Sequence, residues 1–174
     1  MDLLVLRHGK SSWADLNLVD ELRPLKKRGR RDARNMGAFI RDRQLLPDLI
    51  LSSTATRTEQ TVKRALKSMG LPKEKIQRDG QLYHAGPRTW LQTLRACPAD
   101  AHRVMIVGHN PGLEELIVLL CSHQITRPAD GKLLPTAALA HLQISGTWAA
   151  LEPGVGTLLS ITRPRTLTTL SPIS

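Results

Sequence analysis

The sequence predicts an α/β fold, on two observations. Short apolar runs at residues 3–6, 48–52 and 104–107 have the composition of strands buried on both faces. Helix-like segments, in which apolar residues recur at i, i+3, i+4 and i+7, follow these runs along the chain. Such alternation is typical of open α/β sheets, in which ligands bind beyond the carboxyl ends of the strands.

The first run stops at Arg7-His8-Gly9. Gly9 permits a tight turn, so Arg7 and His8 are expected at the strand's carboxyl end. Arg7 offers a permanent charge and a planar fork of donors that suits phosphate. His8 offers a nucleophile whose neutral form is well populated at pH 7. Taken alone, the triplet also fits a capping arginine beside a surface histidine. The later segments of the chain distinguish this interpretation from a phosphate site.

A polar stretch, residues 10–25, separates this motif from the first helix. Its length is unusual for a connection in a compact domain and suggests a functional loop. The helix that follows has a basic outer face and ends before Pro47. Its apolar stripe is formed by Ala33, Met36, Gly37 and Ile40.

The second strand, residues 48–52, leads into another helix that Gly70 closes. Thr54 or Thr56 is expected to cap its N-terminus. Arg57 then lies in the first helical turn, beside unpaired backbone N–H groups that favour anions. An exposed helix arginine is the alternative interpretation.

The third strand-to-helix junction contains His109. Residues 76–83 are expected to be extended, and Pro87 suits the first position of the next helix. The strand at 104–107 then stops at Gly108-His109-Asn110-Pro111-Gly112, where Asn110 is the expected N-cap. His109 therefore also lies at a strand end, and the pattern predicts that Arg7, His8, Arg57 and His109 converge on one phosphate pocket.

The rest of the chain is less regular. Strands are expected at residues 137–144 and 158–162. We expect one domain over residues 1–162 and a weakly ordered tail over 163–174. Cys97 and Cys121 lie far apart among apolar residues, which favours buried free thiols over a disulfide or a metal site.

The net charge of +10 raises nucleic acid as a possible partner. With one Tyr and one Phe, however, the chain shows no aromatic platform for bases, and a basic surface that attracts anionic substrates is favoured. No apolar run reaches membrane-spanning length. Because Met1-Asp2 leads straight into the first strand, we expect no signal peptide and a cytoplasmic protein.

Together these motifs resemble the histidine phosphatase superfamily, the phosphoglycerate mutase-like fold, and within it the SixA-type phosphohistidine phosphatases. The resemblance runs from Leu3 to about Ile144. Besides Arg7-His8-Gly9 and residues 107–112, it rests on Lys10-Ser11-Ser12-Trp13, Arg23-Pro24-Leu25 with Arg28-Gly29, Asp32-Ala33, Ser52-Ser53 through Arg57, Gln60-Thr61 and Pro135-Thr136-Ala137-Ala138.

The resemblance implies a three-layer α/β/α fold with a mostly parallel sheet. It implies that His8 accepts the phosphoryl group while Arg7, Arg57 and His109 hold the phosphate oxygens. Fixed positive donors around a highly anionic transferring group would stabilise its transition state. No carboxylate cluster suggests a magnesium or zinc site, so we expect no metal and no cofactor.

One position departs from the family pattern. Many members carry a carboxylic proton donor in the segment that corresponds to residues 82–85, where this chain has His84. An alkoxide leaving group needs a good acid, whereas the imidazole of phosphohistidine needs less help. His84 is therefore a candidate acid, or none is required.

The sequence is compatible with three functions. We favour hydrolysis of phosphohistidine in proteins, since the short chain leaves little sequence for a lid over a small metabolite. The alternative is a phosphatase for a small anionic phosphoester. A non-catalytic basic module that binds phosphate or nucleic acid is disfavoured, because a binding module needs no nucleophile.

Overall fold

The computed structural model describes residues 1–122, 125–126 and 128–167. Its centre is a six-stranded sheet in the order β3-β2-β4-β1-β5-β6. The strands are β1 (Asp2–Arg7), β2 (Leu49–Ser53), β3 (Ile76–Asp79), β4 (Arg103–Gly108), β5 (Leu139–Ile144) and β6 (Gly156–Thr162). Neighbours from β3 to β1 are parallel, and β5 is antiparallel to both β1 and β6. The expected mostly parallel sheet is confirmed.

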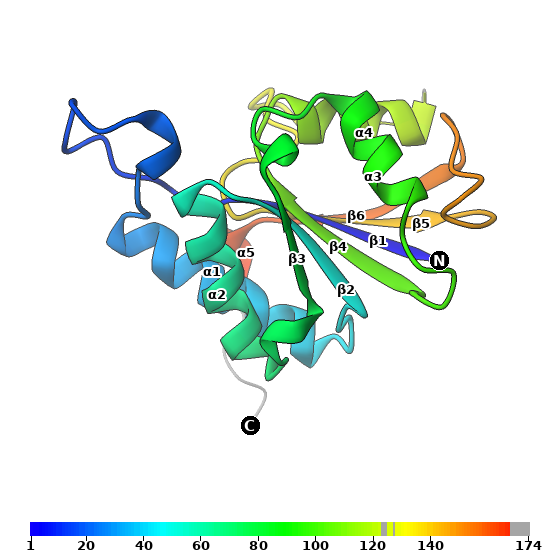
Figure 1. The fold of residues 1–174 in the computed structure, drawn as a ribbon, viewed down its shortest axis with the longest axis horizontal. Coiled ribbons are helices and arrows are strands. Elements are labelled where there is room, and N and C mark those ends of the chain that lie inside the picture. Colours follow the sequence, from blue (N-terminus) through cyan, green and yellow to red (C-terminus); the bar gives the residue numbers. More distant parts are fainter. Residues whose placement is uncertain (123–124, 127, 168–174) are drawn as a thin grey trace.

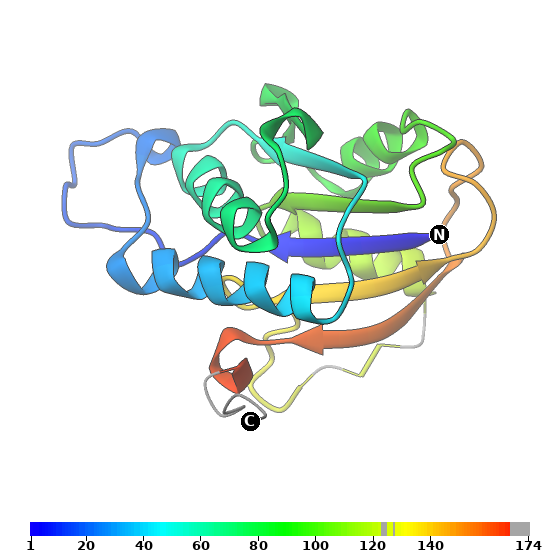
Figure 2. The same cartoon turned by 90° about the horizontal axis from the view of Figure 1, so that it is seen from below.

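Helices cover both faces of the sheet and complete the three layers (Figure 1). One face carries α1 (Lys27–Asp42), α2 (Thr56–Met69) and the short α5 (Pro164–Leu167). The other carries α3 (Pro87–Arg95) and α4 (Gly112–Cys121). Short 3₁₀ turns lie at Asp20–Leu22, Lys73–Lys75 and Gly80–Leu82. Figure 2 shows α1 lying along the sheet while β5 and β6 form its far edge.

The alternation of side chains along β1 explains the apolar run. Leu3 and Val5 pack into the cluster shared with α3 and α4, and Leu4 and Leu6 pack into the cluster shared with α1 and α2. All four side chains are fully buried. A central strand covered by helices on both faces must be apolar at every position, as the sequence indicated.

Both expected N-caps are wrong. Helix α2 begins at Thr56, its N-cap residue is Ala55 and makes no side-chain cap, and the Thr54 hydroxyl donates instead to Glu21. Helix α4 begins after Pro111, and the Asn110 amide donates to Glu114 and to the Leu134 carbonyl. The side chains of Thr54 and Asn110 therefore form hydrogen bonds with other groups and do not cap their helices.

The extended stretch at residues 76–83 is shorter than expected. Strand β3 ends at Asp79, whose carboxylate accepts the Gln81 N–H at 2.8 Å and starts a 3₁₀ turn. This turn delivers Tyr83 and His84 to the carboxyl edge of the sheet, where they approach the ring of His109.

The other expectations concern the tail, the thiols and membrane association. Residues 163–167 include α5, whereas 168–174 lie outside the described residues. That residues 1–162 form one folding unit stays a prediction. Cys121 is buried, Cys97 is half-buried, and both are free thiols. Within the described chain, no helix has the length and apolarity needed to cross a membrane.

Candidate active site

The structure brings Arg7, His8, Arg57 and His109 together at the carboxyl edge of the sheet. Arg7 pairs with Gly108 across β1 and β4, so the two histidines that follow these residues lie side by side. Their ring centroids are 5.1 Å apart. Arg57 enters from the first turn of α2, directly after β2. Three neighbouring parallel strands thus deliver the four side chains.

His8 has the geometry of an uncharged nucleophile. Its Nδ1 lies 2.7 Å from the Gly9 carbonyl oxygen, which can only accept, so Nδ1 carries the proton and Nε2 keeps its lone pair. Burial lowers the pKa of His8 to about 4, and the positive charges of Arg57 and Arg7 act in the same direction. The ring is therefore neutral at physiological pH.

The turn after His8 is fixed by close backbone packing. A Cβ on Gly9 would lie 2.7 Å from the Gly29 carbonyl oxygen, and a Cβ on Gly29 would overlap the backbone of Lys10. The Gly9 N–H also donates to Thr61 Oγ1 at 3.0 Å. Helices α1 and α2 therefore both hold the nucleophile turn in place.

His109 is oriented by Ser53. The Ser53 Oγ lies 3.0 Å from His109 Nε2 and also accepts the Ala55 N–H. The serine hydrogen is then available to Nε2, which leaves the ring proton on Nδ1, a buried atom without a partner in the described structure. Burial lowers the pKa of His109 to about 3, and the neighbouring His8 and Arg57 act in the same direction. His109 can thus offer a neutral N–H donor to an anion.

Arg7 also keeps an unused donor. Its Nη1 donates to the Leu134 carbonyl at 3.0 Å, while its buried Nε has no hydrogen-bond partner among the described residues. A buried guanidinium N–H without a partner is costly. Together with His109 Nδ1, it marks the places where phosphate oxygens would be bound.

Asp20 lies among the cationic groups, a position that the sequence did not reveal. Its backbone and side-chain oxygens accept from Arg57 at 2.6 and 2.9 Å, and its carboxylate also accepts from Arg23 at 2.5 Å and Tyr83 at 2.8 Å. Although burial alone raises the pKa of this carboxyl, the Tyr83 and Arg57 contacts lower it to about 2. Asp20 is therefore ionised and neutralises part of the phosphate site.

The loop predicted to be functional is what positions Asp20. An isolated bridge between Ser11 and Leu25 closes its base. Inside the loop, Arg23 is buried and donates to Ser11 Oγ and to the Ser12 carbonyl. The exposed Trp13 stacks on its guanidinium, 3.1 Å from ring centroid to Cζ. Arg23 thus stabilises the loop through these hydrogen bonds and donates another to one carboxylate oxygen of Asp20.

His84 lies at the rim of the site. It is exposed, has a left-handed backbone with φ of 59°, and its ring centroid is 3.9 Å from that of Tyr83. The His84 and His109 rings are 6.5 Å apart. The geometry leaves His84 next to the pocket rather than inside it.

Neither a cluster of metal ligands nor a large cavity coincides with the four site residues in the described chain. Among the described residues, no group of three or more His, Cys, Asp or Glu side chains could hold a metal ion. A cavity of about 640 Å³ lies between α2 and β3, and none of the four site residues lines it. The four site residues therefore lie at a cation-lined edge of the sheet and not in that cavity.

Similarity to known proteins identifies the family of this chain. Residues 3–82 match the family model of the histidine phosphatase superfamily, branch 1. An uncharacterized protein from Mycobacterium tuberculosis is 33% identical over 164 residues, covering 92% of this chain and 100% of the relative. The chain belongs to the histidine phosphatase superfamily.

Solved structures narrow the subgroup of this histidine phosphatase. The SixA protein from Agrobacterium tumefaciens, to which phosphohistidine phosphatase activity is ascribed, is 29% identical with a TM-score of 0.79, covering 94% of this chain and 97% of that one. A protein histidine phosphatase SixA complexed with tungstate has a TM-score of 0.81 at 21% identity, over 96% and 99% of the two chains, and supports the fold. This histidine phosphatase is of the SixA type, and its reaction is the hydrolysis of a phosphorylated substrate.

Proposed function

We propose that this enzyme removes phosphoryl groups from phosphohistidine in proteins, through an intermediate in which His8 carries the phosphate. The observation that carries the proposal is the state of His8, a buried neutral ring whose proton is held on Nδ1 by the Gly9 carbonyl. Its Nε2 lone pair is available, and three cationic or N–H donor side chains surround it.

The first step transfers the phosphoryl group. His8 Nε2 forms a bond to phosphorus while the bond from phosphorus to the leaving group breaks, and the electron pair departs with the leaving group. Arg7, Arg57 and His109 hold the equatorial oxygens, on which charge accumulates in the transition state. In the second step a water oxygen forms a bond to phosphorus, the P–Nε2 bond breaks and its electron pair returns to His8, and the two water protons leave with the product as dihydrogen phosphate.

The available acids favour phosphohistidine over an alkyl phosphate. Asp20 is the carboxylate in the site, and its lowered pKa keeps it ionised, so as placed it cannot give a proton to an alkoxide. An imidazole leaving group is far less basic than an alkoxide and requires less acid catalysis. We propose that His84, at the rim, serves as the proton donor where a substrate needs one.

A phosphatase for small phosphomonoesters is the second candidate. It is supported by the same phosphate site, and it requires the acid role of His84. The superfamily membership favours either phosphatase over a non-catalytic module that binds nucleic acid. The cytoplasmic location expected from the sequence stays a prediction.

Substrate profiling separates the two candidates. The enzyme is incubated, with a chelator present throughout, with a phosphohistidine protein and with a panel of phosphorylated metabolites. We expect phosphate release from the protein at a kcat/KM above that of every metabolite, and we expect the chelator to have no effect. A metabolite hydrolysed about tenfold more efficiently than the protein would establish the second candidate.

A further inference from the structure

A second cationic cavity lies beside the candidate active site. It has a volume of about 240 Å³. The charged residues that line it are Lys10, Arg28, Asp130, Lys132, Arg163 and Arg165. The mechanism above uses none of them.

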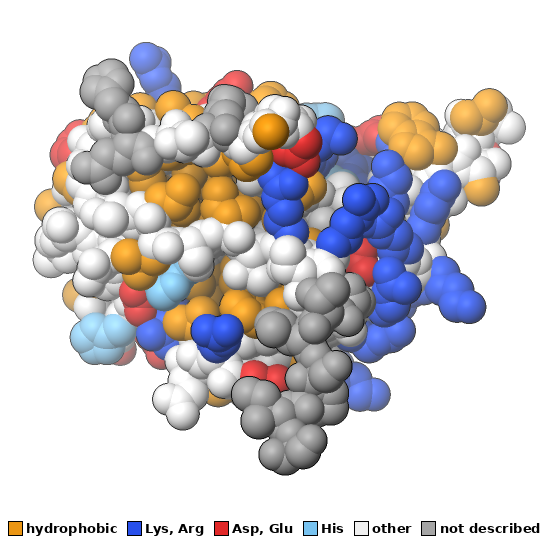
Figure 3. Space-filling view, turned by 180° about the vertical axis from the view of Figure 1, so that it is seen from behind, with side chains coloured by type: hydrophobic (Ala, Val, Ile, Leu, Met, Phe, Trp, Pro, Cys, Tyr) orange, Lys and Arg blue, Asp and Glu red, His pale blue; other side chains and the backbone are white. Residues whose placement is uncertain are grey.

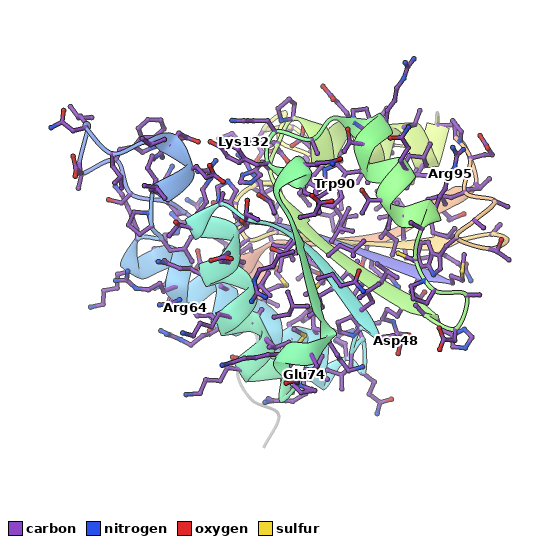
Figure 4. The ribbon with its side chains drawn as sticks, viewed as in Figure 1. Asp48, Arg64, Glu74, Trp90, Arg95 and Lys132 are labelled. Carbon is purple, nitrogen blue, oxygen red and sulfur yellow. The ribbon has the colours of Figure 1, made fainter. Side chains whose placement is uncertain are left out.

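The cavity shares its wall with the phosphate site. Lys10 follows the nucleophile turn, and the segment at residues 132–137 passes between the two places. Leu134 in that segment accepts from Arg7 on the active-site side, whereas Lys132, Pro135 and Thr136 line the cavity. Figure 4 labels Lys132 at the end of the molecule where β1 and β4 finish. An extended substrate could reach both places at once.

The acidic groups near the cavity already have partners. Asp130 accepts two hydrogen bonds from Arg163, at 2.6 and 3.1 Å, and Asp32 pairs with Arg28 at 3.3 Å. Among the ion pairs of the described residues, none joins Lys10 or Lys132 to a carboxylate, and the charge of Lys132 is only a secondary cause of the lowered pKa of Asp130, after the hydrogen bond from Arg163. The two ammonium groups can therefore also attract an external anion.

The grouping of cationic side chains around this cavity differs from the basic face of a single solvated helix. The cations come from four separate parts of the chain, around residues 10, 28, 132 and 163. Gathering like charges costs free energy unless an anion offsets it. Figure 3 shows Lys and Arg side chains concentrated on the α1 side of the molecule, which would further attract such an anion.

We propose that this cavity is an anion subsite that binds a second acidic group of the substrate, a carboxylate or a phosphate, next to the phosphoryl group being hydrolysed. The inference rests on the proposed phosphatase function and deepens it, because it makes the enzyme selective for substrates with two neighbouring anionic groups. Lys132 and Lys10 supply the charge, and Arg163 fixes the loop by also donating to the Lys132 carbonyl at 2.6 Å.

The test compares substrates that differ only in the second anion. One pair is a phosphohistidine peptide flanked by Glu and the same peptide flanked by Gln. The other pair is butane-1,4-diol bisphosphate and butyl phosphate. Nitrophenyl phosphate, which lacks a second anion, reports the basal activity. The proteins are the wild type, Lys10→Ala, Lys132→Ala, Lys132→Arg, and Lys67→Ala as a control that removes one charge from the distant groove between α2 and β3.

We expect the wild type to prefer the doubly anionic member of at least one pair by about tenfold in kcat/KM, mainly through KM, as one charge-assisted contact would give. Lys10→Ala and Lys132→Ala should lose this preference, Lys132→Arg and Lys67→Ala should keep it, and all should retain the basal activity. A preference confined to the peptides identifies a carboxylate of a protein substrate, and one confined to the bisphosphate identifies a second phosphate.

Two results would overturn the subsite. One is the absence of a preference in both pairs, and the other is a preference that survives Lys132→Ala or disappears equally in Lys67→Ala. Failure of the proposed function gives a different result. In that case neither peptide is hydrolysed while nitrophenyl phosphate is, and the bisphosphate pair still tests the subsite.

Discussion

The two sides of the candidate active site are built in different ways. On the sheet side, His8 and His109 follow adjacent parallel strands and are held by a backbone carbonyl and a serine hydroxyl. On the loop side, Asp20 and Arg23 belong to a long connection and hold one another through charge. Arg57 links the sides, since it contacts Asp20 and lowers the pKa values of both histidines.

The sheet side therefore positions the reacting groups, whereas the loop side controls the charge that a phosphate meets. The two histidines of the sheet side are neutral and aligned before any substrate arrives, so little reorganisation is needed at the nucleophile. The loop side is charged and internally neutralised, so a phosphate must compete with the carboxylate of Asp20 for Arg57. Changes on the sheet side should therefore alter the rate, and changes on the loop side should alter binding.

The largest effect is expected at the nucleophile. His8→Ala should reduce phosphatase activity by about 10³-fold or more and abolish phosphate labelling of the enzyme, because no other group can form the intermediate. His109→Ala should reduce turnover by about 10²–10³-fold while labelling persists, since it removes one donor to the transition state. Both are measured with nitrophenyl phosphate and a radiolabelled substrate. A His8→Ala protein of near wild-type rate would contradict the mechanism.

A smaller and selective effect is expected at His84. If it donates the leaving-group proton, His84→Ala should slow alkyl phosphates by about 10²-fold, the lower range for general acid catalysis, and hardly affect phosphohistidine or nitrophenyl phosphate. His102→Ala removes another exposed histidine and serves as the control. Equal losses on all three substrates would make His84 a positioning residue at the rim.

The loop side is tested by Asp20→Asn. Removing the carboxylate charge should strengthen the binding of inorganic phosphate by up to about fivefold, the range of a half-exposed ion pair. Asp15→Asn changes a carboxylate of the same loop that has no contact with Arg57, and it should have no effect. The measurement is phosphate binding by calorimetry. Weaker binding in Asp20→Asn would show that Asp20 supports the site instead of competing with its ligand.

The smallest change is expected on mild acidification. Protonation removes the lone pair of His8, and its lowered pKa of about 4 keeps about 90% of the ring neutral at pH 5. A histidine with the ordinary value would lose about 25-fold in its neutral form between pH 7 and 5. Ring ¹⁵N shifts of His8 should therefore remain those of a neutral imidazole at pH 5. Titration near pH 6.5 would refute the burial argument.

The sequence predicted the sheet side of the site better than the loop side. Apolar runs identify strands, and a strand direction is enough to place the residue that follows it, so His8 and His109 could be located. Asp20 could not, because its position depends on how residues 11–25 fold back on themselves and on a contact with Tyr83. A polar loop has no periodicity from which such a contact can be derived.

Contacts between distant segments also explain what the sequence missed at the N-terminus of α2 and at the edge of the sheet. Thr54 has the residue type of an N-cap, but its hydroxyl meets Glu21 from the loop, and no local pattern contains that contact. The edge of the sheet at β5 and β6 was predicted as strands, whereas its antiparallel pairing with β1 is a matter of tertiary topology. The resemblance to the superfamily added what periodicity could not, namely the layer arrangement and the roles of the residues.

The contact between Gly9 and Gly29 has a consequence for how this chain can vary. Residue 29 lies in helix α1 and has no place in the chemistry, yet a methyl group there would collide with the backbone of Lys10. Substitution at this position would push the nucleophile turn away from the strand ends that align it. Position 29 of α1 is thus restricted by the turn that holds the proposed nucleophile His8, and a screen for inactive variants should recover it although it is not one of the proposed site residues.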